Sequence, residues 1–298
     1  MSDGVSLSAA ERVLMAHAAA SYVLRLAGLP FIVIKGPVGR SLIPSSAGIS
    51  TDVDILIDPH QEAPSVAALQ RAGWQVIERS GRRAARHATI LAHPVFGVYL
   101  DLHSYFPGIG ASPERAFADM WTRRRVVSLA GQPINVPDTT DHILVLVLHS
   151  VRSGPSSLRA AGDAIDYRFG TDDEPLVERA RSLDALGVLS LHPRFAYING
   201  RPGYYWRLKR RGVSGLTQWC HRVVTAPSFA EALKEARAAL AVNPLRGNRR
   251  APLSTVLSRA AADITVIVTE GLTMLWARRG RAWPWSSRLT RARRARGR

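Results

Sequence analysis

The chain has 298 residues, 46% of them hydrophobic, and its single cysteine, Cys220, excludes a fold held together by disulfides within the chain. No segment reaches the roughly 18 uninterrupted apolar residues of a membrane-spanning helix, and the N-terminus lacks the pattern of a secretory signal. The formal net charge of +17 comes entirely from residues 201–298, which carry 21 basic and 4 acidic residues, whereas residues 1–200 carry 19 of each. We therefore expect a globular, cytoplasmic protein with an excess of positive charge near its C-terminus.

The first half of the chain predicts helices alternating with strands. Residues 6–28 have the spacing of an amphipathic helix, with a capping box at Ser8 and Glu11 and a stop at Gly28. The β-branched run that follows predicts a buried strand. The elements expected in this half are a helix at 6–28, a strand at 31–36, a helical turn within 36–44, a strand at 51–58, a helix from about 60 to 72, a strand at 74–80, a hairpin at 82–106 and a hairpin or strand pair at 126–137.

Beyond residue 138 the apolar spacing becomes helical. Helices are expected at 141–152, 156–169, 174–187 and 229–241, then a linker at 243–252 and a long amphipathic helix at 253–277. The pattern predicts an α/β (α+β) fold, a mixed sheet with flanking helices, followed by a helical region and a basic tail. We place the domains at residues 1–138, 139–245 and 246–298.

Three aspartates stand within this expected sheet. Asp52 and Asp54 are two residues apart, so both side chains lie on one face of their strand, roughly 6–7 Å apart, while Val53 and Ile55 point into the core. Asp101 lies in the apolar run VYLDLHSYF of a later strand. Such carboxylates repel one another unless a cation lies between them, and Mg²⁺ prefers oxygen ligands of this kind. A metal site would bring the three within about 6 Å, open to solvent; capping of a strand end or pairing with an arginine is the alternative.

Lys35 and Gly36 follow the first strand. A glycine at this place lets the backbone approach a phosphate, and a lysine adds a point charge for it. Lys35 is also the only lysine before position 209. A nucleoside triphosphate would supply both the phosphates for Lys35 and the Mg²⁺ for the aspartates.

Together these motifs resemble the nucleotidyltransferase superfamily of DNA polymerase beta, and more narrowly its branch of uncharacterised nucleotidyltransferases with a Lys-Gly pair. The resemblance covers roughly residues 10–170. The motif residues are Lys35, Gly36, Asp52, Asp54, Asp101 and His103, and His149, Arg159 and Asp163 match a later helical segment. The family commonly carries an arginine where Ile49, Ser50 and Thr51 stand here, so either Arg40 substitutes for it or the substrate differs.

The resemblance implies a nucleotidyltransferase-like fold and transfer of a nucleoside monophosphate from an NTP, expected to be ATP, to a hydroxyl or similar group of an acceptor, with release of pyrophosphate. It implies Mg²⁺ or Mn²⁺ as cofactor. The catalytic and metal-binding residues would be Asp52, Asp54 and Asp101. The nucleotide-binding residues would be Lys35, Gly36, Arg40, Ser50 and Thr51. The residues that lie next to the acceptor or support the site would be His103, His149, Arg159 and Asp163.

Two other functions remain open. A DxD motif also serves metal-dependent glycosyltransferases, and a degenerate nucleotidyltransferase domain could act as an adaptor. The segment 278–298 carries nine arginines and no acids, so it is either a solubilising tail or a site for an anionic partner, namely nucleic acid or a membrane surface. The acceptor is equally open between a small molecule, a peptide, a protein and RNA.

Overall fold

The computed structural model describes residues 7–43, 51–79, 88–153 and 155–198, together with 264, 265 and 268. The chain divides into two compact units, Met1–Ala185 and Leu186–Arg298. The described elements of the second unit are α8 (Leu186–Leu189) and η2 (Pro193–Phe195). The expected helix at 229–241, the linker, most of the helix at 253–277 and the arginine-rich tail lie outside the described residues. The predicted division into three domains stays a prediction.

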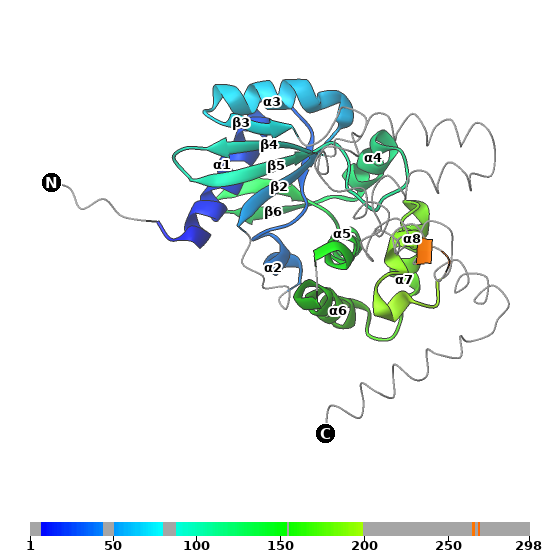
Figure 1. The fold of residues 1–298 in the computed structure, drawn as a ribbon. Helices are drawn as coiled ribbons and strands as arrows, with labels where there is room; N and C mark the ends of the chain where they lie inside the picture. The colour runs from blue at the N-terminus through cyan, green and yellow to red at the C-terminus, as the bar shows by residue number, and fades with distance from the viewer. Residues whose placement is uncertain are drawn as a thin grey trace, which may run out of the picture. The chain divides into compact units, whose positions relative to one another are not determined.

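A mixed sheet forms the centre of the first unit (Figure 1). Its strands run in the order β1-β2-β5-β4-β3; only β2 and β5 pair in parallel, and the other neighbours are antiparallel. The hairpin expected within 82–106 is confirmed by the antiparallel pair β4–β5. The bounds are β1 (Phe31–Val33), β2 (Asp52–Ile57), β3 (Gln75–Arg79), β4 (Ala88–His93) and β5 (Val98–His103).

The remaining elements of this unit follow the expected order. The capping box of the first helix is confirmed, because Ser8 Oγ accepts from the Glu11 amide and the Glu11 carboxylate accepts from the Ser8 amide. The elements are α1 (Ala9–Leu26), α2 (Gly39–Leu42), η1 (Pro59–Gln61), α3 (Glu62–Arg71), α4 (Pro113–Arg123), the hairpin of β6 (Arg125–Leu129) and β7 (Gln132–Val136), α5 (Thr139–Ser153), α6 (Pro155–Phe169) and α7 (Glu174–Ser182). Within the part of the chain that the structure describes, none of the helices has the length and apolarity to cross a bilayer.

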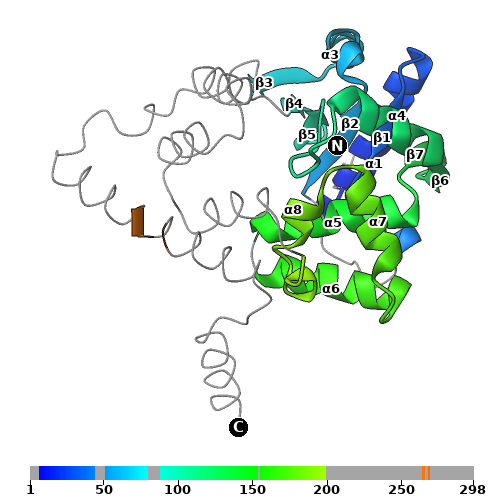
Figure 2. The ribbon, with the colours of Figure 1, turned by 90° about the vertical axis from the view of Figure 1, so that its right-hand side faces the viewer.

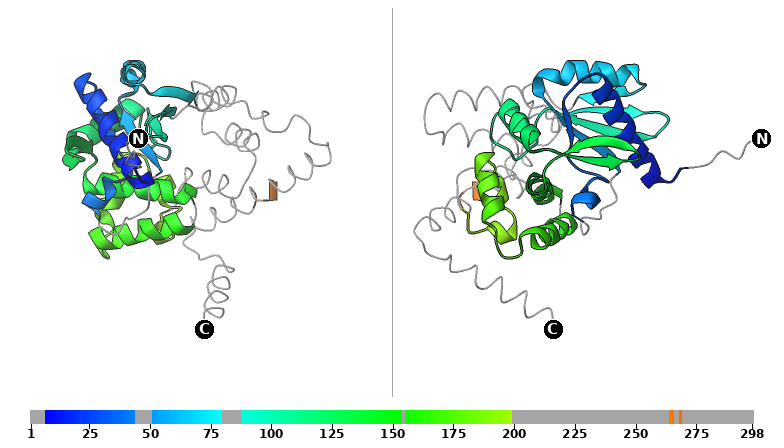
Figure 3. Two further views of the ribbon diagram at one scale, coloured as in Figure 1. Left: turned by 90° about the vertical axis from the view of Figure 1, so that its left-hand side faces the viewer. Right: turned by 180° about the vertical axis from the view of Figure 1, so that it is seen from behind.

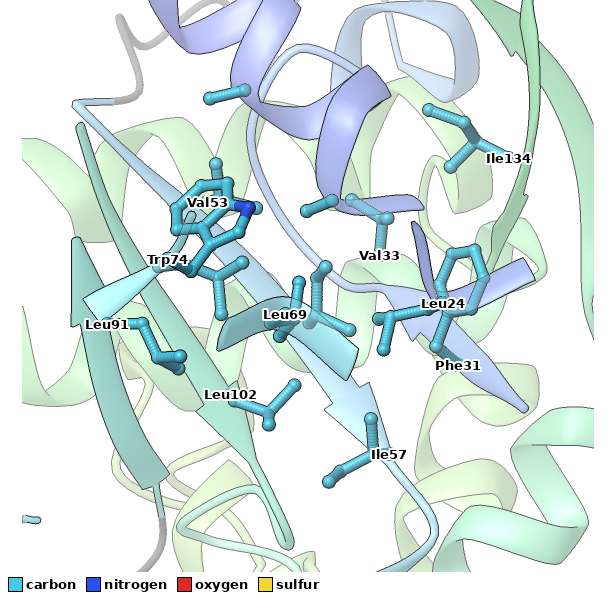
Figure 4. Close-up of a cluster of buried hydrophobic side chains, with 14 of the residues drawn as sticks. Leu24, Phe31, Val33, Val53, Ile57, Leu69, Trp74, Leu91, Leu102 and Ile134 are labelled. Carbon is cyan, nitrogen blue, oxygen red and sulfur yellow. The ribbon is translucent and has the colours of Figure 1, made fainter. Parts of the chain in front are cut away.

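One face of the sheet carries the hydrophobic core. Helix α1 lies across this face (Figure 3, right), and α3 and the β6–β7 hairpin add side chains to the same cluster. Val53 and Ile57 of β2 point into it, beside Trp74 and Leu102 (Figure 4), and Ile55 belongs to the same cluster. Since side chains alternate along a strand, this packing leaves Asp52 and Asp54 on the opposite face.

A buried ion pair holds α5 in place next to that opposite face. Helix α5 packs on α6 and α7 (Figure 2). Arg179 of α7 donates through Nε and Nη2 to the two carboxylate oxygens of Asp141 on α5, and its Nη1 lies 2.6 Å from Asp119 Oδ1 on α4. The Arg179 and Asp141 side chains are only 7% and 0% exposed. The pair therefore ties α5 to two other helices.

Replacing Arg179 by methionine should destabilise the protein. The substitution removes both hydrogen bonds of Arg179 to the buried Asp141 carboxylate and leaves Arg123, whose Nε lies 3.4 Å from Oδ2, as the cation beside it. Breaking a buried ion pair typically costs about 3–5 kcal/mol of unfolding free energy, and the remaining Arg123 contact should place the loss toward the lower end. Arg181→Met is the matched control, because Arg181 lies on the same helix but forms an exposed pair with Glu178, and it should change stability little. Urea unfolding of both variants measures the difference; equal losses would show that the Arg179 pair does not stabilise this packing.

Candidate active site

The parallel pairing of β2 with β5 brings the acidic residues together. In this register Asp54 lies opposite Asp101, and residues opposite each other on neighbouring strands share a face of the sheet. His103 lies two residues beyond Asp101 and therefore on the same face. Ligand atoms of Asp54, Asp101 and His103 all lie within 4.8 Å of one another. The three side chains form a cluster that could hold a metal ion.

Asp54 is buried and already has two nitrogen partners. Its side chain is 2% exposed, and its Oδ1 lies 2.8 Å from Lys35 Nζ and accepts from His103 Nε2 at 3.0 Å. Burial alone would raise the pKa of Asp54, but the His103 hydrogen bond and the Lys35 charge outweigh it and hold that pKa below its usual range. Within the described residues Oδ2 of Asp54 accepts no hydrogen bond. One oxygen of this carboxylate thus remains for a cation.

Asp101 is half-buried, and within the described part of the chain it has no hydrogen bond or ion pair. Burial raises its pKa, and the nearby carboxylates of Asp54 and Asp52 raise it further, while His103 opposes them. An acid in this situation is one whose charge a divalent cation would compensate.

Asp52 departs from the expected arrangement. It lies at the start of β2 opposite Tyr99, close enough to act on Asp101, but it is outside the three-residue cluster, where His103 takes its place. The expectation of three acids open to solvent is also wrong for Asp54, because Lys35 and His103 cover it. Both differences follow from how β1, β2 and β5 pack together, which no short motif records.

The strand β1 delivers Lys35 to Asp54. The Ile34 amide donates to the Asp54 carbonyl at 3.1 Å, so the next residue leaves the sheet directly beside that carboxylate. Gly36 has a φ of +88°, in the left-handed region that favours glycine. The Gly39 amide then donates to the Gly36 carbonyl, which closes the turn into α2. The conformation explains why glycine follows lysine here.

His17 is a residue of this region that the motifs did not reveal. It is fully buried on α1, where its Nδ1 hydrogen-bonds with the Val13 carbonyl at 2.9 Å. It also interacts with the Lys35 backbone and, electrostatically, with Asp54; burial lowers its pKa. The only signal in the sequence is a histidine within the apolar stripe of a helix.

Helix α5 brings His149 to the same place. Burial lowers the pKa of His149 to about 4, and the positive charges of Lys35 and Arg152 contribute in the same direction. Its Nε2 shares a hydrogen bond of 2.9 Å with the Ser153 hydroxyl. His149 therefore stands near Lys35 as a neutral imidazole at neutral pH.

The other predicted residues are less closely associated with the cluster. Arg159 and Asp163 have exposed side chains on α6, and among the described residues neither forms an ion pair with the acids. Arg40 lies in α2, although its side chain is outside the described part. Thr51 is exposed directly before β2, and Ser50 lies outside the described residues.

The donor set fits Mg²⁺ or Mn²⁺. Asp54 Oδ2 and the Asp101 carboxylate are hard oxygen donors without other partners in the described chain, as these ions prefer. The His103 imidazole is less suited to Mg²⁺ and already donates to Asp54. His103 is thus better placed to orient Asp54 than to serve as a ligand of Mg²⁺.

Comparison with known proteins identifies a family. A family model described as an uncharacterised nucleotidyltransferase matches residues 6–196, more than half of the chain. No curated protein matches the chain.

Three solved structures show distant likeness. The antibiotic-resistance factor ANT(2'')-Ia in solution has 13% identity over 59% of this chain and 94% of its own, with a TM-score of 0.40. An antigenic nucleotidyltransferase-like protein from Paracoccidioides brasiliensis has 14% identity over 61% of this chain and 93% of its own, with a TM-score of 0.37. ANT(2")-Ia in complex with adenylyl-2"-tobramycin has 13% identity over 58% of this chain and 98% of its own, with a TM-score of 0.39.

Divalent cations should stabilise the folded protein through the acidic cluster. Because a ligand that binds only the folded state raises stability, MgCl₂ or MnCl₂ should raise the melting temperature of the parent. Asp101→Asn should lose most of this increase, whereas Glu114→Gln, which removes an exposed charge on α4, should retain it. Thermal unfolding with and without each salt makes the comparison; an equal increase in both variants would exclude Asp101 as a ligand.

Proposed function

The chain belongs to the family of uncharacterised nucleotidyltransferases, and from this premise we propose that it transfers a nucleoside monophosphate from an NTP, with ATP the expected donor, to a hydroxyl or similar group of an acceptor. The enzyme class and the mixed α/β fold agree with what the motifs predict. The finer proposal is carried by one observation, the convergence of Asp54, Asp101 and His103 beside Lys35. Assignment to the Lys-Gly branch stays a prediction.

The catalytic residues of this proposal are Asp52, Asp54 and Asp101. Asp54 and Asp101 would hold the cation, and Asp52 would lie next to this cluster. When bound there, a divalent cation offsets the charge that develops on the phosphate oxygens. Asp101, which has no hydrogen-bond partner in the described chain, would accept the proton of the acceptor hydroxyl. The acceptor oxygen then forms a bond to the α-phosphorus, the bond to the bridging oxygen breaks, and pyrophosphate leaves.

Lys35 and Gly36 would bind the triphosphate, with Arg40, Ser50 and Thr51 as further candidates. A lysine ammonium has three donors, and the structure uses one of them for Asp54. Lys35 can therefore remain paired with Asp54 while it donates to a phosphate oxygen. The left-handed conformation of Gly36 would let the backbone approach the same phosphate.

His103, His149, Arg159 and Asp163 would support the site or the acceptor. The hydrogen bond of His103 to Asp54 supports an orienting role. The neutral state of His149 suits a hydrogen bond to the acceptor or a phosphate. The roles proposed for Arg159 and Asp163 are supported by the sequence resemblance alone.

The two alternatives are weaker than this proposal. Membership in a nucleotidyltransferase family argues against a glycosyltransferase use of the DxD motif. The intact cluster of Asp54, Asp101 and His103, with Lys35 paired to Asp54, argues against a degenerate adaptor. An anionic partner of the arginine-rich tail stays a prediction, outside the described residues.

Incubation with each NTP and Mg²⁺ tests the proposal directly. Mass spectrometry of small molecules, peptides, proteins and RNA from a lysate should detect an acceptor that gains one nucleoside monophosphate, with pyrophosphate released. Asp101→Asn should lower this transfer by about 100-fold or more, the scale of a lost general base. Neither an adduct nor pyrophosphate with any NTP would overturn the proposed function.

Replacing Lys35 by alanine should weaken NTP binding by about 1–3 kcal/mol, the scale of a charge-assisted hydrogen bond. Stability should fall as well, because buried Asp54 keeps only His103 as a partner. Lys35→Arg keeps the charge and should retain more of both properties. Calorimetric titration with Mg²⁺ and ATP, below the melting temperature of each variant, separates binding from folding. Equal affinity in the folded alanine variant would exclude contact between Lys35 and the phosphates.

A further inference from the structure

The last turn of α5 holds a second cation, Arg152, close to the acidic cluster. Its guanidinium carbon lies 5.3 Å from the centre of the Phe106 ring, and its Nε donates to the Leu148 carbonyl at 3.2 Å. Phe106 is buried, and its ring packs against that of His103 at a centroid distance of 6.0 Å. A buried aromatic ring beside the cluster thus supports the guanidinium group.

Arg152 has no acidic partner of its own. Within the described residues no carboxylate forms an ion pair with it, and its only hydrogen bond is the one from Nε to a carbonyl. It nevertheless interacts electrostatically with Asp54, and it acts with Lys35 on His149. Its two terminal nitrogens therefore remain available next to the site.

Lys35, unlike Arg152, already has an acidic partner. The charge of Lys35 is balanced by Asp54, with which it forms an ion pair at 2.8 Å. A triphosphate keeps a net negative charge even with one divalent cation bound, and a lysine that already has a carboxylate partner can compensate little of it. A cation that is not paired with the acids would compensate more of this charge, and a guanidinium binds phosphate oxygens in pairs.

We propose that Arg152 binds the triphosphate of the donor nucleotide, on the α5 side of the acidic cluster and together with Lys35. This inference rests on the proposed function and assigns a specific phosphate-binding residue to it. The position is prepared before the nucleotide arrives, because Phe106 supports the guanidinium and the Arg179–Asp141 pair holds α5. Little side-chain freedom is then lost when the phosphate binds.

Arg152→Gln tests the assignment because it removes the charge while keeping a polar side chain. Arg168→Gln is the matched control: Arg168 also lies near the end of a helix, over the Phe169 ring at 5.5 Å, and has no ion pair in the described chain. Calorimetric titrations of the full chain would use Mg²⁺ with ATP and Mg²⁺ with inorganic triphosphate. The dissociation constants of both ligands should rise about 10- to 100-fold in Arg152→Gln and stay within about twofold in Arg168→Gln. Arg152→Lys should fall between the two.

The outcomes separate this inference from the proposed function. If the parent binds no NTP, the proposed function fails and this inference fails with it. If the parent binds ATP and folded Arg152→Gln binds it equally well, only the role of Arg152 is overturned. A loss for ATP without a loss for inorganic triphosphate would also overturn it, because the contact would then be to the nucleoside. Should the glutamine variant not fold, unchanged affinity for both ligands in Arg152→Lys and Arg152→Met overturns the assignment.

Discussion

The candidate site depends on the register in which β2 pairs with β5. This parallel pair sets Asp54 opposite Asp101 and Val53 opposite Leu100. Because side chains alternate, one register serves both faces: it directs the apolar residues into the core and gathers the acids on the other side. A shift of one residue would exchange the faces and bury the acids among Leu24, Phe31 and Trp74. The packing of the core on one face of the sheet therefore specifies the site on the other.

Gathering carboxylates in this way has an electrostatic cost, which the protein offsets unevenly. Asp54 is almost completely buried, and it is compensated by both Lys35 and His103. Asp101 forms no hydrogen bond or ion pair with either of them, and burial together with the carboxylates of Asp54 and Asp52 raises its pKa against the opposing charges of His103 and Lys35. Full compensation of both would remove the tendency to bind a cation, whereas compensation of neither would destabilise the sheet. Asp54 is thus compensated within the protein, whereas the charge of Asp101 would be compensated by a bound cation. Such an arrangement is expected of a site that gives up some stability for function.

Local patterns in the sequence were sufficient for much of this arrangement. The alternation in TDVDILID correctly placed Val53 in the core and Asp54 on the other face, and the Lys-Gly pair marked the turn after β1. The spacing of His103 two residues after Asp101 also placed it beside the site. Its closer association with Asp54, in place of Asp52, depends on which residues of β2 and β5 stand opposite each other. That register joins segments almost fifty residues apart and is set by the whole core. For Arg152 the sequence leaves a contact to phosphate and a solvated helix face equally open. The position of its guanidinium over the Phe106 ring distinguishes it from other arginines on helix surfaces.

The two oxygens of Asp54 show how the same residues can serve stability and function. Oδ1 takes both nitrogen partners, and Oδ2 takes no hydrogen bond within the described chain. A cation on the Oδ2 side would not have to displace Lys35, so the ion pair that makes a buried carboxylate tolerable can persist during nucleotide binding. In the proposed function Lys35 would contribute its remaining donors to the phosphates, and Arg152 would compensate a large share of their charge. The lysine that follows β1 would then serve both the buried acid and the substrate, whereas the arginine on α5 would serve the substrate alone.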